Sequence, residues 1–219
     1  MRLLITALPL AFAVTLRAAE EQAGIDPLER ARREFRQGHV DAALSILIET
    51  EKHASPTVMT LDLRGCIHLE QRKFEDAVAA FKAAQATKER TYLPRLHLGD
   101  AFLRQGKWAE ARDTYESLLK ETDILAVNER MRYAIFLTYL GAKDEAGAKA
   151  ALDRVPFPTE TAAYYYAQAG WSFARGSKRA GEKWMRTADN LFDAQKSAWF
   201  ARPLYEFGWV KTKPPLVFD

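Results

Sequence analysis

The sequence has 219 residues, of which 48% are hydrophobic and 28% charged; this is ordinary for a folded soluble protein and excludes long disorder. Its 32 basic and 29 acidic residues give a net charge of +3, and the two signs alternate without long runs. Because neutralising phosphates needs a concentrated basic face, we expect no nucleic-acid partner.

The first 19 residues differ from the rest of the chain. Arg2 is followed by an apolar run from Leu3 to Leu16, and then by the small residues Ala18 and Ala19. This pattern is typical of a secretory signal peptide, and the run is too short to span a bilayer comfortably. We therefore predict a signal peptide over residues 1–19, with an uncleaved N-terminal membrane anchor as the alternative.

The cysteine and asparagine residues limit the cellular compartments that are compatible with the sequence. Cys66 is the one cysteine, so the fold has no internal disulfide, and no cysteine follows the apolar run to carry a lipid anchor. Neither asparagine lies in an N-x-S/T glycosylation site. Together with the signal peptide, these features favour export to a bacterial periplasm.

Residues 24–195 contain an internal repeat with a spacing of 34 or 35 residues, seen in three separate series of positions. Small residues of the first predicted helix recur at Ala31, Gly65, Gly99, Ala134 and Ala169. Turn residues recur at Gly38, Arg72, Gly106, Gly141 and Gly176. Small residues of the second predicted helix recur at Ala43, Ala77, Ala111, Ala146 and Gly181. The pattern predicts five helix pairs and no sheet, with glycines ending helices in the left-handed conformation.

The third copy contains Leu98-Gly99-x2-Phe102 followed by Ala111-x3-Tyr115. This resembles the tetratricopeptide repeat, whose motif is W-x2-L-G-x2-Y, then A-x3-F, then P. The resemblance implies an all-α, right-handed solenoid of helical hairpins over residues 24–195. Residues 196–219 do not repeat and are rich in aromatic side chains, so we predict a capping helix over about 196–208 and an extended tail.

No pattern of catalytic residues is present. The four histidines are scattered and none lies in H-E-x-x-H, and the chain has no phosphate-binding loop and no G-x-S-x-G. Cys66 has no histidine partner recognisable from the sequence, and is more simply a small buried hydrophobe. We therefore predict no catalytic residue, metal site, cofactor or small-molecule substrate, and hence no enzyme.

The resemblance also implies a binding surface, because stacked first helices in this family line a concave groove that holds peptides. In each first helix, the small residues lie in a stripe that packs against neighbouring helices. The stripe shifted by one residue along the helix would face the groove, and its residues in the second half of the chain are apolar. The predicted groove consists of Leu96, Asp100, Leu103, Met131, Ile135, Tyr139, Tyr166 and Phe173. The alternative is that the superhelix or the C-terminal cap covers these residues.

The sequence thus predicts an exported scaffold or adaptor that binds a protein or peptide partner in an apolar groove. The competing interpretations are an accessory subunit of an envelope enzyme and a self-associating structural module.

Overall fold

The computed structural model of the chain describes residues 26–89 and 91–218. The predicted signal peptide lies outside these residues. Within them the chain forms eleven α-helices and no strand, which confirms the all-α prediction. None of the described helices is both long and apolar enough to cross a membrane.

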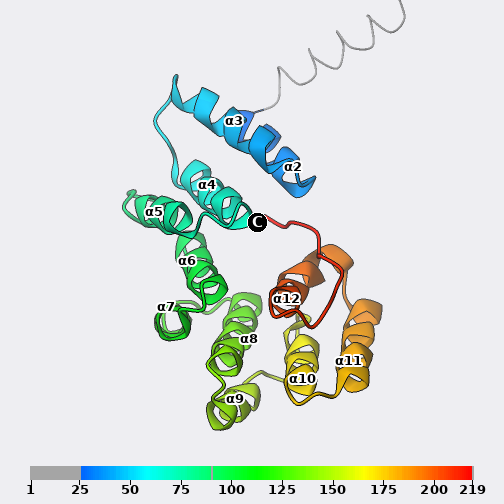
Figure 1. Cartoon of the computed structure of the whole chain (residues 1–219). Coiled ribbons are helices and arrows are strands. Elements are labelled where there is room, and N and C mark those ends of the chain that lie inside the picture. The colour runs from blue at the N-terminus through cyan, green and yellow to red at the C-terminus, as the bar shows by residue number, and fades with distance from the viewer. Residues whose placement is uncertain (1–25, 90, 219) are drawn as a thin grey trace, which may run out of the picture.

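Ten helices form five consecutive pairs (Figure 1). The pairs are α2 (Pro27–Arg36) with α3 (Val40–Glu51), α4 (Val58–Glu70) with α5 (Phe74–Gln85), α6 (Leu93–Arg104) with α7 (Trp108–Leu119), α8 (Leu125–Gly141) with α9 (Glu145–Leu152), and α10 (Ala163–Ala174) with α11 (Lys178–Leu191). The last helix, α12 (Ala194–Glu206), follows the repeats where a cap was expected.

Local chemistry defines the ends of the helices. At the start of α4, Thr57 and Thr60 form a capping box: the Thr57 amide donates to Thr60 Oγ1 at 2.8 Å, and the Thr60 amide to Thr57 Oγ1 at 3.2 Å. The turn inside each of four pairs contains a residue with positive φ, at Gly38, Arg72, Gly106 and Gly176. These four turns lie where the sequence placed them.

The turn of the fourth pair differs from the prediction by two residues. Gly141 is the last residue of α8, and Lys143 has the positive φ of 59°. The second-helix position shifts equally, since Ala148 is fully buried whereas Ala146 is exposed. Gly141 has a different role, because a Cβ there would lie 2.6 Å from the Trp108 ring. A glycine required for packing was therefore mistaken for a turn glycine.

Small residues allow the two helices of a pair to approach closely, as predicted. A Cβ on Gly65 would lie 2.3 Å from the Phe81 ring, and one on Gly99 would lie 2.5 Å from the Tyr115 ring. Ala31 and Ala43 of the first pair have no exposed surface. Large side chains at these positions would overpack the contact between helices.

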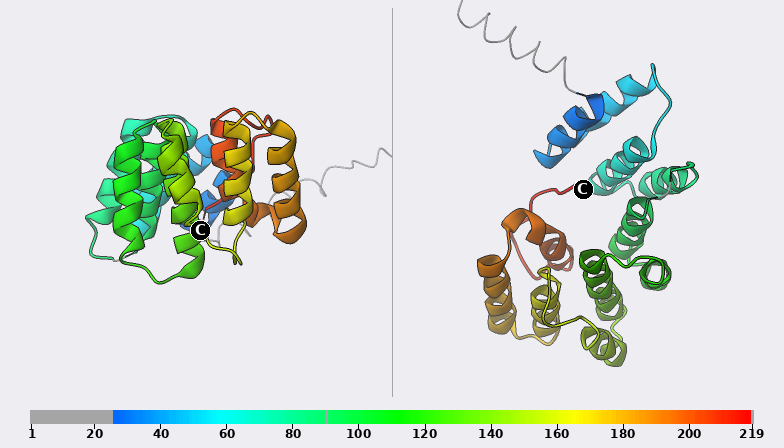
Figure 2. Two further views of the ribbon diagram at one scale, coloured as in Figure 1. Left: turned by 90° about the horizontal axis from the view of Figure 1, so that it is seen from below. Right: turned by 180° about the vertical axis from the view of Figure 1, so that it is seen from behind.

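The five pairs stack into a curved array, with α2, α4, α6, α8 and α10 on its inner side (Figures 1 and 2). Helix α12 turns back onto this inner side and contacts α8, α10 and α11. From α12 the chain continues towards α4, so that its C-terminal end lies beside the first repeats (Figure 1). The array is thereby closed into a ring by the last helix and the tail.

Candidate functional site

The predicted groove is covered rather than open. Leu96, Met131 and Tyr166 are at most 2% exposed, and Leu103, Ile135 and Phe173 at most 8%. Helix α12 supplies much of this cover: the Phe200 ring lies 6.2 Å from that of Tyr166. Trp209, just beyond α12, stacks on Phe173 at 6.0 Å. The expectation of an open apolar surface in the second half of the array is therefore corrected, because that surface is part of the core.

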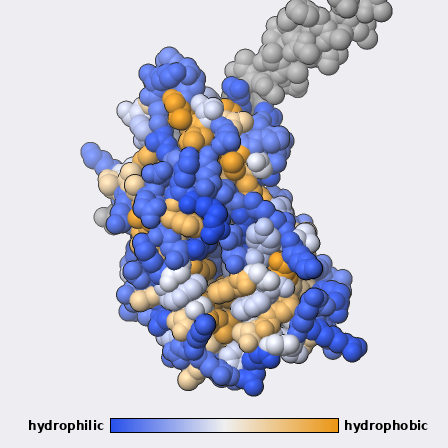
Figure 3. Space-filling model, viewed as in Figure 1, coloured by the Kyte–Doolittle hydropathy of each residue, from blue (hydrophilic) through white to orange (hydrophobic). Residues whose placement is uncertain are grey.

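The remaining groove residues have other surroundings. Tyr139 packs within its own helix pair, where a Cβ on Gly147 would lie 2.3 Å from its ring, and Arg112 lies over the ring at 3.7 Å. Asp100 accepts a hydrogen bond from Tyr115 Oη at 2.7 Å and one from Arg130 Nη2 at 2.6 Å. On the face shown in Figure 3, hydrophobic residues appear in separate groups among hydrophilic ones.

A cavity of about 230 Å³ lies inside the ring, between the inner helices, α12 and the tail. Asp100 and Leu103 from the predicted groove line this central cavity. Phe35, Cys66 and Leu69 also line it, and they occupy the positions of the first two repeats that are equivalent to Leu103 or Asp100. The predicted stripe therefore lines the central cavity in the first half of the array, and it is covered in the second half.

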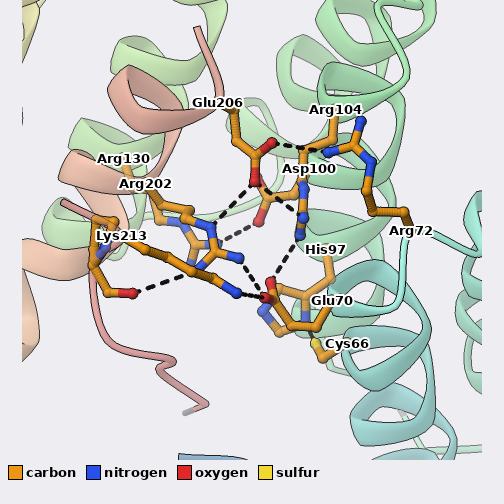
Figure 4. Close-up of polar contacts among 11 residues, drawn as sticks. Cys66, Glu70, Arg72, His97, Asp100, Arg104, Arg130, Arg202, Glu206 and Lys213 are labelled. Atoms are coloured by element: carbon orange, nitrogen blue, oxygen red, sulfur yellow. Dashed lines mark hydrogen bonds and ion pairs between the residues drawn. The ribbon is translucent and has the colours of Figure 1, made fainter. Parts of the chain in front are cut away.

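Charged side chains link α12 to the first repeats across this cavity (Figure 4). Glu70 of α4 pairs with Arg104 Nη1 at 2.9 Å, with Arg202 of α12, and with Lys213 Nζ of the tail at 3.4 Å. Glu206 of α12 pairs with Arg104 Nη2 at 3.1 Å. Burial opposes ionisation of Glu70, but its cationic partners outweigh burial and hold the pKa of this carboxyl below its usual value.

A second polar cluster is buried at the edge of the cavity. His97 Nδ1 lies 3.0 and 3.1 Å from the two carboxylate oxygens of Asp62, and 3.6 Å from Cys66 Sγ. Burial would lower the pKa of His97, but the Asp62 carboxylate and the Cys66 sulfur together raise it well above its usual value. Burial also raises the pKa of the Cys66 thiol, which disfavours the reactive thiolate.

The C-terminal tail lies along the inner side of the first repeats. Residues 213–218 have no regular secondary structure, and Pro215, Leu216 and Val217 line the cavity. Phe218 is 4% exposed. Its ring packs edge-on against Phe35 at 6.3 Å and lies 6.2 Å from His97.

Comparison with known proteins agrees with this architecture. A family profile described as tetratricopeptide repeat matches residues 63–123, which cover α5, α6 and α7 and most of α4. This segment of the chain therefore matches the tetratricopeptide repeat, and the helix pairs of the described residues are consistent with a protein built from such repeats. Neither a curated protein nor a solved structure matches it significantly. Tetratricopeptide repeats generally mediate protein–protein interactions and are typically not enzymes.

Sequence reasoning missed most of the polar residues around the cavity. A signal for two of them was present, because Glu70 and Arg104 are separated by one repeat length and so occupy equivalent positions in α4 and α6. His97 is also one repeat length from Leu63, so the repeat predicts that His97 lies at the position equivalent to the neighbour of Asp62. No comparable signal existed for Arg202 or Phe218, because they lie outside the repeats.

Proposed function

We propose that this chain is an exported protein-interaction scaffold whose inner surface on α2, α4 and α6 binds an extended apolar segment of a partner protein. The observation that carries the proposal is the position of the tail. An extended, proline-containing segment already occupies this surface and buries Phe218 against Phe35 and His97. The surface therefore has the shape and the apolar character to hold such a segment.

The chemistry of the tail indicates the chemistry of the partner. Phe218 is inserted into the core, Arg32 lies 5.2 Å from the centre of its ring, and Leu216 packs against the same apolar cluster two residues earlier. Apolar side chains two residues apart in an extended chain point to one side. The partner segment would present an aromatic residue and a second apolar residue with this spacing, in place of the tail.

The tail must be displaced for such a partner to bind. A covalently attached segment competes at an effective concentration of about 1 mM, so an incoming segment binds weakly unless it makes additional contacts. A chain that ends at Val210 should therefore bind a labelled peptide of residues 211–219 at least about tenfold more tightly than the full chain does.

The experiment is a fluorescence-anisotropy titration of that peptide with both chains, with helicity checked by circular dichroism. The matched control peptide has serine in place of Phe218, and should bind at least about tenfold more weakly because the aromatic anchor is lost. A Phe218→Ser variant of the full chain provides the same comparison should the shortened chain fail to fold. Equal affinity for both peptides, or no binding to a folded chain with a released tail, would contradict the proposal.

Export is supported by the sequence pattern of residues 1–19. Intact-mass measurement on protein from its native host should give a start near Ala19 or Glu20. A mature protein that keeps Met1 would contradict cleavage.

A further inference from the structure

Three side chains of different chemical type converge beside the central cavity. Asp62 and Cys66 are four residues apart on α4, which places them on one face of the helix, and His97 comes from α6 of the next repeat. Their ligand atoms, a carboxylate oxygen, Sγ and Nδ1, all lie within 4.8 Å of one another. All three residues are buried, with exposures of 0, 6 and 1%.

We propose that Asp62, Cys66 and His97 bind a Zn²⁺ ion. Zn²⁺ prefers a tetrahedral set of sulfur, nitrogen and oxygen ligands at about 2.0–2.3 Å, so its ligand atoms lie roughly 3–4 Å from one another. The distances of 3.0 Å from His97 Nδ1 to Asp62 Oδ1 and 3.6 Å from Nδ1 to Cys66 Sγ match this requirement. A thiolate and an imidazole in the set favour Zn²⁺ over Mg²⁺ or Ca²⁺, which take oxygen ligands.

The charges of the three ligands also suit this ion. A thiolate from Cys66 and the carboxylate of Asp62 carry two negative charges, and a neutral His97 imidazole carries none, so together they balance the two positive charges of Zn²⁺. The occupied site would therefore have no net charge, and uncompensated charge is strongly disfavoured in a buried site.

The cavity provides access and the remaining coordination position. Cys66 and His97 both line it, so an ion or a water molecule in the cavity can reach them. Three protein ligands leave the fourth position of a tetrahedral ion for water or for a group that enters the cavity. His97 Nε2 has no hydrogen-bond partner among the described residues, and a water molecule in the cavity can accept from it.

Cobalt provides a sharp test, because Co²⁺ substitutes for Zn²⁺ and bonding to a thiolate produces an intense charge-transfer absorption. Cys66 is the only cysteine in the chain, so this absorption in the untagged protein reports on that residue alone. We expect the band to appear and to saturate at one Co²⁺ per chain, and stoichiometric Zn²⁺ to abolish it. Absence of the band from the folded wild-type protein would overturn the proposal.

Variants test the ligand set. Cys66→Ser should lose the band, and it should weaken Zn²⁺ binding, measured by competition with a chelating dye, at least about tenfold, since loss of an outer-shell partner alone weakens metal sites about 10–100-fold. The control is His39→Gln, because His39 is exposed beside Glu34 and is not part of the cluster. If Zn²⁺ affinity depends on His39 and not on Cys66, binding is confined to the surface and the proposal is wrong.

Discussion

At the scale of single residues, the buried carboxylate of Glu129 stabilises a loop by accepting its hydrogen bonds. Its side chain is 1% exposed and accepts hydrogen bonds from the amides of Glu160 and Thr161, both at 2.9 Å. The hydroxyls of Thr159 and Thr161 donate to the same carboxylate at 2.7 and 2.6 Å. The acid on α8 thereby fixes the loop between α9 and α10, and joins the fourth pair to the fifth.

We predict that Glu129→Ala lowers the free energy of unfolding by at least about 2 kcal/mol, because it leaves buried donors without an acceptor. Urea denaturation followed by circular dichroism measures this loss. The control is Glu145→Ala, which removes an exposed ion pair with Arg175 and should change stability by less than about 1 kcal/mol. Similar losses in the two variants would show that the carboxylate of Glu129 does not stabilise the loop.

His97 makes the stability of the metal-free protein depend on pH. Its pKa is raised well above the usual 6.5, so the folded state binds its proton more tightly than the unfolded state does. The stabilisation is therefore fully present below pH 6.5, and is lost as pH rises through the raised pKa. Burial raises the pKa of Cys66 from its usual 9.0, so the thiol lowers stability only at a higher pH.

With a chelator present, we predict that the free energy of unfolding of the wild-type protein falls from pH 6.5 to 9. Asp62→Asn should remove most of this slope, because the neutral amide no longer stabilises the imidazolium. Denaturation curves at several pH values, interpreted by linkage, provide the measurement. A wild-type stability that stays constant or increases over this range would contradict the raised pKa.

At the scale of helices, the close contact within a pair depends on residues without a side chain. Gly99 of α6 faces the ring of Tyr115 on α7, and the Tyr115 hydroxyl also donates to Asp100. A larger residue at position 99 would displace the Tyr115 ring and so disrupt the hydrogen bond from Tyr115 to Asp100. The contact thus controls both the spacing of α6 and α7 and one polar group beside the cavity.

Gly99→Leu should lower the free energy of unfolding by about 1–3 kcal/mol through overpacking, with a matching fall in Tm. The control is Ala109→Leu, because Ala109 is exposed on α7 and a larger side chain there should change stability by no more than about 0.5 kcal/mol. Differential scanning calorimetry compares the variants. A wild-type Tm for Gly99→Leu would mean that α6 and α7 are less closely packed than the structure shows.

The sequence predicted the elements well where the repeat was regular. Positive φ at Gly38, Arg72, Gly106 and Gly176 confirms four of the five turns, because each helix had to end where its small-residue spacing placed it. The fourth turn failed because two different physical requirements select glycine. One is a turn that needs the left-handed conformation. The other is close packing of helices, and Gly141 is an example because it lies against the Trp108 ring.

The candidate site was predictable only within the repeats. The stripe through Cys66, Asp100 and Leu103 faces the cavity because helical geometry and one repeat length determine its direction. The cover on Tyr166 and Phe173 was not predictable, because it depends on how a non-repeating helix folds back. A sequence repeat predicts the contacts that recur in every repeat, but it does not predict contacts that only one element, such as α12, makes.

At the scale of the whole molecule, the contacts of α12 and the tail convert a linear stack into a closed ring. In an open solenoid each repeat contacts only its neighbours, so the ends can unfold separately. Here Arg202 pairs with Glu70, and Phe218 packs on Phe35, so the last element stabilises the first two repeats. The whole chain should therefore unfold more cooperatively than a stack without these contacts.

We predict that Arg202→Ala combined with Phe218→Ser lowers the urea m-value, because the first repeats then unfold separately from the rest. The control is Arg175→Ala, which removes an exposed ion pair with Glu145 of α9 and should leave the m-value unchanged. Circular dichroism, compared with tryptophan fluorescence, would resolve separate transitions, because all five tryptophans lie at Trp108 or later and none lies in the first two repeats. A single steep transition in the double variant, as in the wild type, would show that the ring closure does not link the repeats.

Helix α12 and the tail also determine when folding can be completed. Most contacts in a helical repeat protein join residues close in sequence, and such low contact order gives fast folding. The pairs between Glu70 and Arg202 and between Arg72 and Glu206 join residues that are 132 and 134 positions apart. The first repeats can fold early from their local contacts, but their apolar inner surface stays exposed until residues 213–218 pack against it. During that interval the half-folded chain is vulnerable to aggregation, and a chaperone that covers this surface would protect it.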